Sequence, residues 1–223
     1  MPTRAAPGTD EWYHVYNRGV DKRRTFTAKA DLQRFQLLLY LCNNNQPVQV
    51  RNLYTRKIAD LESDSVYRRQ PLVSIASYCI MPNHFHIVAK QIEDNGLSQF
   101  MQKLMTGYTM YFNKKYERTG ALFAGTYKYK HLAADTYLRQ CIAYVHLNPA
   151  EIADSEWKHG TALVQKVEKL LSEYTFSSFL DYQNHERAEY AILADDIADF
   201  IRELPSPKAT IRDAHEYYKT TKV

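Results

Sequence analysis

The chain has 223 residues, 45% of them hydrophobic and 24% charged, which excludes a disordered protein and is sufficient for a packed core. No apolar run approaches the roughly 20 residues of a membrane-spanning helix, and the N-terminus carries no hydrophobic signal segment. We therefore expect a cytoplasmic protein with no membrane partner. The formal net charge of +4 is too small to establish a nucleic-acid partner by itself.

The N-terminal part of the chain predicts a strand followed by a helix. Residues 11–18 alternate as in a strand that is buried on one face. Residues 29–42 carry apolar side chains at helical spacing. Residues 43–70 are polar and contain Pro47, and we interpret them as an insertion outside the core, with a short helix near residues 57–64.

The middle of the chain predicts two strands, a helix and a further strand. Strands at residues 72–80 and 84–90 flank a turn at Pro82, a helix follows at residues 97–116, and the last strand spans about residues 121–131. The order strand, helix, strand, strand, helix, strand predicts an α+β fold, with a ferredoxin-like or RRM-like antiparallel sheet and helices on one face. In this topology the third strand lies inside the sheet.

The C-terminal part predicts a helical appendage to this sheet. Apolar stripes indicate helices at residues 161–172 and 187–204. We expect one domain at residues 11–155, with the insertion described above, and a C-terminal helical extension at residues 156–223.

Two histidines on the predicted third strand are candidate metal ligands. His84 and His86 are two residues apart, so their side chains point to the same face of a strand, roughly 6.5 Å apart along the chain. Two imidazoles at this spacing can converge on one divalent ion. The same pattern also occurs where histidines serve only packing.

A helix predicted at residues 135–148, ending before Pro149, carries a candidate nucleophile. Gln140, Tyr144 and Asn148 recur every four residues and therefore share one face of this helix. A tyrosine between two amides on one face is not required by packing, although a single helical tyrosine commonly packs its ring and leaves its hydroxyl in water.

Basic side chains cluster after the first strand, at the end of the 97–116 helix and along the last strand. Tyrosine and lysine alternate at residues 127–130, and aromatic rings stack on unpaired bases while ammonium groups bind phosphates. Strands also favour tyrosine for packing. The candidate DNA contacts are Arg18, Arg23, Lys115, Tyr127, Lys128 and Lys130.

Four tracts in this order resemble the REP-associated branch of the single-tyrosine HUH (IS200-like) transposases. The tracts are YHVYNRG at residues 13–19, YCIMPNHFH at residues 78–86, GLS at residues 96–98 with FN at residues 112–113, and YVHLNP at residues 144–149. The resemblance covers roughly residues 11–155. The chain departs from the pattern at Thr126, where relatives usually carry an arginine, and this departure concerns a DNA contact.

The resemblance implies a metal-dependent nuclease and strand transferase that acts on single-stranded DNA with hairpin-forming, REP-like ends. It makes His84 and His86 metal ligands, Tyr144 the nucleophile, and Asn148 the residue that completes the metal shell. We expect Mg²⁺ or Mn²⁺ as the cofactor and a 5′-phosphotyrosine intermediate, with Gln140 positioning the phosphate or a water. His146 projects from another helical face than Tyr144 and is not counted as a ligand.

Two other functions remain open at this stage. One is a non-catalytic single-stranded nucleic-acid-binding protein on the same fold. The other is a zinc hydrolase that uses the histidine pair and a water nucleophile, although the chain has no H-E-x-x-H motif. The oligomeric state is left open between a monomer and a homodimer.

Overall fold

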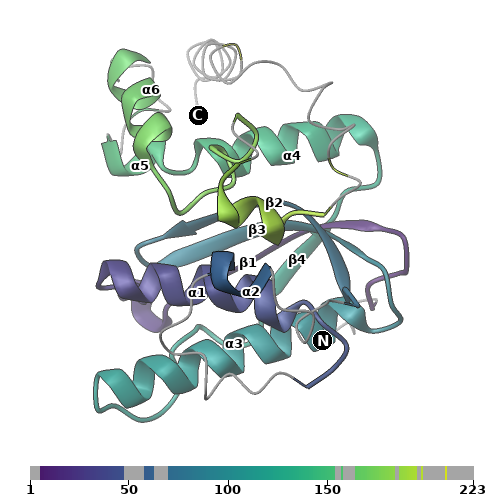
Figure 1. Ribbon diagram of the computed structural model, residues 1–223, viewed down its shortest axis with the longest axis vertical. Helices are drawn as coiled ribbons and strands as arrows, with labels where there is room; N and C mark the ends of the chain where they lie inside the picture. The colour runs from purple at the N-terminus through teal and green to yellow at the C-terminus, as the bar shows by residue number, and fades with distance from the viewer. Residues whose placement is uncertain are drawn as a thin grey trace.

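The protein is described by a computed structural model (Figure 1), which covers residues 6–47, 58–62, 70–153, 157, 164–183, 186–194, 197 and 209. Within these residues, no helix is both long enough and apolar enough to cross a membrane.

The core of the fold is a four-stranded antiparallel sheet. Its strands are β1 (Trp12–Arg18), β2 (Val73–Met81), β3 (His84–Gln91) and β4 (Lys128–His131). Their spatial order is β2-β3-β1-β4, and each neighbouring pair is antiparallel. This order is the predicted ferredoxin-like one, so the fold class is confirmed and the histidine strand β3 lies inside the sheet.

Two long helices cover one face of the sheet. They are α1 (Lys29–Cys42) and α3 (Gly96–Lys115), and Figure 1 shows both on the side opposite α4. The ring of Phe35 on α1 lies 5.0 Å from Phe85 on β3 and 5.1 Å from Tyr108 on α3, measured between ring centroids. These three fully buried rings join both helices to the sheet.

The last strand is shorter than predicted, because only Lys128–His131 are in β4. Residues 121–127 leave the strand conformation, and Phe123 packs its ring against Phe85 at 5.7 Å in the core. The chain turns at Gly125, whose φ of 76° is readily available only to glycine. Burial of one aromatic ring therefore outweighed the β-propensity of the segment.

The other face of the sheet is partly covered by α4 (Asp135–Leu147), which lies over β2 and β3. Two shorter helices follow, α5 (Ala150–Ala153) and α6 (Val164–Glu173). A small second core joins them to the end of α4; it consists of Leu147, Ala150, Trp157, Val167, Leu171 and Phe179.

Asn148 keeps the helical geometry predicted for it, although Pro149 follows directly. Asn148 has helical angles, φ −53° and ψ −39°. Its backbone N–H donates to Val145 O at 3.4 Å, and its side-chain Nδ2 donates to Tyr144 O at 2.8 Å. These two bonds retain the helical turn although Pro149 disfavours it.

The described part of residues 187–204 does not form the α-helix that was predicted there. It forms a short 3-10 helix, η5 (Ala188–Ile192), after which Leu193 is extended. The backbone N–H of Ala194 donates to Ile75 O on β2 at 3.1 Å, a bond that a continuing α-helix would exclude. Most of the remaining residues of this predicted helix lie outside the described residues.

The outer edge of β2 is paired by the C-terminal segment. Ile80 N donates to Phe176 O and Ser178 N donates to Tyr78 O, each at 3.0 Å. The side chain of Tyr182 adds a bond from its hydroxyl to Ala76 O at 2.7 Å. This segment therefore occupies hydrogen-bonding groups that an edge strand would otherwise expose.

The described part of the predicted insertion contributes to the core instead of leaving it. Helix α2 (Ile58–Glu62) places Ile58 and Leu61 among the buried apolar residues. The remaining residues of the predicted helix at 57–64 lie outside the described residues.

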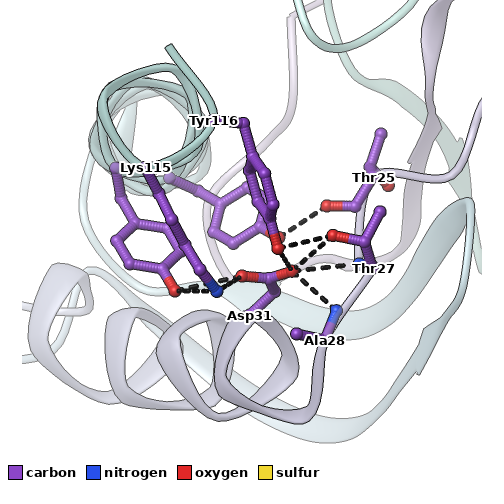
Figure 2. Close-up of polar contacts among 8 residues, drawn as sticks. Thr25, Thr27, Ala28, Asp31, Lys115 and Tyr116 are labelled. Atoms are coloured by element: carbon purple, nitrogen blue, oxygen red, sulfur yellow. Dashed lines mark hydrogen bonds and ion pairs between the residues drawn. The ribbon is translucent and has the colours of Figure 1, made fainter.

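A buried carboxylate ties the start of α1 to the end of α3 (Figure 2). Asp31 Oδ2 accepts the backbone N–H groups of Thr27 and Ala28 and the hydroxyl of Tyr116, and Oδ1 accepts Lys115 Nζ at 2.6 Å. Burial raises the pKa of Asp31, but the hydrogen bonds led by Lys115 and Tyr116 outweigh burial and lower it to about 2. Asp31 is thus an ionised anchor for both helices.

Candidate active site

The candidate site lies on the face of the sheet that α4 shares. Because residues paired across antiparallel strands point to the same face, the pairs Tyr16↔His86 and Arg18↔His84 place all four side chains there. The buried stripe of α4 packs over β2 and β3, which leaves β1 and β4 beside the helix.

The two predicted ligand histidines share this face, as their spacing requires. The ring centroids of His84 and His86 lie 5.0 Å apart, with the ring planes nearly perpendicular at 88°. His84 Nδ1 lies 2.6 Å from Asn83 Oδ1 in the β2–β3 turn. His86 is buried in the sheet, below α4.

Tyr144 is held next to this pair by α4. Its ring centroid lies 5.6 Å from that of His86 and 5.9 Å from that of His14. The side of α4 that bears Leu138, Ile142 and Val145 is buried, whereas Tyr144 keeps 36% of its surface exposed. An exposed tyrosine ring beside the buried His86 and the partly buried His14 is accessible to a substrate from solvent.

His14 belongs to the site but was not predicted as part of it. Its Nε2 lies 2.8 Å from His86 Nδ1, and the two rings stack at 5.0 Å. Burial, followed by the charge of Lys130, lowers the pKa of His14 to about 4, so the ring is neutral near pH 7. The sequence shows that residues 11–18 alternate as in a strand, which places His14 and Tyr16 on one face. That this face is the one with His86 follows only from the pairing of β1 with β3.

A groove of about 820 Å³ runs between α4 and the neighbouring strands, and we name it the α4 groove. Its lining residues are His14, Tyr16, His86, Lys130, His131, Leu132, Ala133, Tyr137, Gln140, Cys141 and Tyr144. The predicted residues His86, Gln140 and Tyr144 thus meet in one groove with the basic Lys130. His84 and Asn148 are not among the lining residues.

Asn148 is at the end of α4, with 3% of its surface exposed. Its amide nitrogen donates to Tyr144 O at 2.8 Å, so the amide oxygen is its group with metal-ligand chemistry. The described residues contain no group of three or more His, Cys, Asp or Glu arranged to hold a metal ion. Among the residues that the structure describes, this amide is a candidate third ligand for the histidine pair.

His146 has a structural position and does not line the α4 groove. It is buried, and its Nε2 lies 2.9 Å from Ser178 Oγ in the segment that pairs with β2. Burial lowers the pKa of His146 to about 3, which keeps the ring neutral near pH 7.

Three of the predicted DNA contacts share the face of the candidate site. Lys128 pairs with Tyr16 and Lys130 with His14 across the β1–β4 ladder, and Arg18 pairs with His84 on the other side of β1. All three are exposed. Arg23 lies outside the sheet, after the 3-10 helix η1 (Val20–Lys22), where it pairs with the carboxylate of Asp21 at 3.2 Å.

The structure does not bring the other two predicted contacts, Lys115 and Tyr127, to this face. Lys115 is at the end of α3, where it forms an ion pair with the buried Asp31. The hydroxyl of Tyr127 lies 3.0 Å from Ser98 Oγ on α3. The alternation of strand residues sends the tyrosines and lysines of residues 127–130 to opposite faces, so they do not form one binding stripe.

One stretch of the chain is similar to a known protein family. Residues 65–148 match the family model described as "Transposase IS200 like". The matched segment contains both β3 histidines and the exposed α4 tyrosine.

The fold is shared with a REP-associated tyrosine transposase. The solved structure of that protein, bound to a REP hairpin, is 15% identical in sequence, with a TM-score of 0.50. The likeness covers 90% of this chain and 94% of that chain. No curated protein matches the sequence.

Proposed function

We propose that this protein is a metal-dependent endonuclease and strand transferase that cuts single-stranded DNA and forms a 5′-phosphotyrosine at Tyr144. The observation that carries the proposal is the exposed Tyr144 ring 5.6 Å from His86 in the α4 groove. Catalytic groups of such an enzyme must face a common space that the scissile phosphate can enter.

The proposed substrate is single-stranded DNA that carries hairpin elements. The solved relative in fold is bound to a REP hairpin, which supports this class of DNA. Arg18, Lys128 and Lys130 share the face of the groove and supply positive charge for phosphates on either side of the cut.

A divalent metal ion, Mg²⁺ or Mn²⁺, is part of the proposal, and the donors present fit it in their chemistry. His84 and His86 provide imidazole nitrogens from one face of β3, and Asn148 is the candidate oxygen donor. When bound, the ion would offset the negative charge on a non-bridging phosphate oxygen.

His14 fits the role of a residue that orients His86. If His86 uses Nε2 as a ligand, its Nδ1 carries the proton and donates to His14 Nε2, 2.8 Å away. This requires a neutral His14, which agrees with its lowered pKa. The hydrogen bond would fix both the tautomer and the ring orientation of His86.

Tyr144 supplies the nucleophile. Its phenolic oxygen forms a bond to phosphorus, the bond from phosphorus to the 3′ oxygen breaks, and the phenol proton is lost while the 3′ oxygen gains one. One phosphoester replaces another, so rejoining needs no external energy source. A phenol in water ionises only near pH 10, so its proton has to be removed as the bond to phosphorus forms.

The proposal is tested by incubating the protein with end-labelled single-stranded hairpin DNA and Mn²⁺ or Mg²⁺, followed by a denaturing gel. We expect a protein-linked label that is absent in Tyr144→Phe, His86→Ala and His84→Ala. Mass spectrometry of the digested adduct should place the DNA on Tyr144.

Tyr127→Phe is the matched control, because it removes a phenol on the opposite face of the sheet and should keep the adduct. Salt-sensitive DNA binding without an adduct would instead favour the non-catalytic binding protein. Cleavage that survives Tyr144→Phe without an adduct would favour a water nucleophile.

A further inference from the structure

We propose that the α4 groove also binds an unpaired nucleobase within a few nucleotides of the scissile phosphate, between the ring of Tyr137 and the amide of Gln140. This inference rests on the proposed function, since it names a feature of the DNA bound in the same groove. The base site would lie at the end of the groove away from His86.

The spacing along α4 suits two adjacent subsites. Tyr137, Gln140 and Tyr144 are at i, i+3 and i+7, so they share one helical face, and all three line the groove. Seven residues of α-helix span about 10 Å. Stacked nucleotides in one strand are about 3.4 Å apart, so a base beside Tyr137 would lie within about three nucleotides of a phosphate at Tyr144.

Tyr137 is poorly explained by packing. It keeps 61% of its surface exposed, while Leu138 next to it is buried against the sheet. The flat face of a tyrosine stacks on any base, and exposed aromatic rings next to basic side chains are typical of single-strand binding surfaces. Lys130 in the same groove provides the basic partner for the backbone.

The other walls of this end of the groove suit the plane and the edge of a base. Leu132 and Cys141 offer apolar surface, and the exposed Gln140 carries a hydrogen-bond donor and an acceptor on one planar amide. Such an amide pairs with the edge of a base through two hydrogen bonds, which discriminates between bases. Tyr137 would thus provide affinity and Gln140 selectivity.

The test uses the full chain carrying Tyr144→Phe, so that binding is measured without cleavage. The probe is a single-stranded hairpin oligonucleotide with 2-aminopurine placed in turn at each position of its unpaired flank, since stacking quenches the fluorescence of this base. We expect one position to be quenched on binding. Adding Tyr137→Ala should abolish that quench and weaken binding about tenfold, whereas adding Tyr137→Phe should retain both.

Two further comparisons sharpen the test. Met110→Ala removes a side chain that is 69% exposed on α3, on the other face of the sheet, and should leave the quench intact. In competition with oligonucleotides that differ only at the quenched position, Gln140→Ala should reduce the preference among the four bases by about fivefold or more.

The inference is overturned if no position shows quenching that depends on Tyr137, or if an abasic competitor binds as well as one with the base. The adduct assay on the unmutated chain is independent of this result. An adduct without Tyr137-dependent quenching removes only the base site, whereas quenching without an adduct removes only the strand transferase.

Discussion

Replacing Lys115 by methionine separates a structural role from a DNA-binding role. In the structure, Lys115 Nζ lies 2.6 Å from Asp31 Oδ1, and the Asp31 side chain is fully buried while Lys115 is 32% exposed. Removing one partner of a buried ion pair costs about 3–5 kcal/mol. Asp31 keeps its bonds from Thr27, Ala28 and Tyr116, and Lys115 is partly solvated, so we expect Lys115→Met to lower the free energy of unfolding by about 2 kcal/mol.

The assay is urea unfolding followed by circular dichroism, together with DNA binding at several salt concentrations. Lys130→Met is the matched control, because Lys130 is an exposed lysine on the face of the candidate site. It should leave stability unchanged and reduce the slope of log affinity against log salt by about 0.7. The reasoning about Asp31 is refuted if Lys115→Met is as stable as the unmutated chain and shows the reduced salt slope instead.

Three further predictions concern acid stability, the metal site and the packing of α3. Because the pKa of Asp31 falls from 3.8 to about 2 on folding, its contribution to stability is present above pH 4 and is lost as the pH falls towards 2. We expect urea midpoints of Asp31→Asn to fall less steeply than those of the unmutated chain over this range; parallel curves would contradict the assignment. His14→Ala should weaken Mn²⁺ binding, measured by electron paramagnetic resonance, about tenfold or more, and His14→Gln, which can accept from His86 Nδ1, should restore most of it; equal binding in all three proteins would exclude the orienting role. A Cβ on Gly96 would lie 2.4 Å from a backbone oxygen, whereas one on Gly107 would lie no closer than 3.6 Å to any neighbour. Gly96→Ala should therefore lower the thermal unfolding midpoint and Gly107→Ala should raise it, and a rise in both would contradict the packing of α3.

Much of the fold was predictable because the sequence pattern is locally consistent. The bounds of α1 were predicted correctly and those of α3 to within one residue at each end, since both helices bury a stripe of apolar side chains at helical spacing. The position of β3 inside the sheet followed from the order of elements alone. The shared face of His84 and His86 followed from strand geometry and needed no tertiary information.

The remaining features depend on contacts between distant segments. In the sequence Lys115 cannot be distinguished from a surface lysine, because its partner Asp31 is on the distant helix α1. In the same way, the contact of the Tyr127 hydroxyl with Ser98 on α3 is not visible in the sequence. His14 enters the site only through the pairing of β1 with β3. The helix predicted beyond Arg187 was wrong in its described part because a hydrogen bond to Ile75 on β2 competed with helical continuation.

The pairing of residues 176–178 with β2 has a consequence for truncated forms of the protein. A fragment ending at residue 155 would retain the groove and its histidines. It would, however, leave the outer edge of β2 unpaired and would lack Ser178, which contacts His146. An unpaired edge strand can form backbone hydrogen bonds with a strand of another molecule. The minimal folded unit is therefore longer than the stretch that carries the chemistry, and shortened versions should self-associate before they lose their secondary structure.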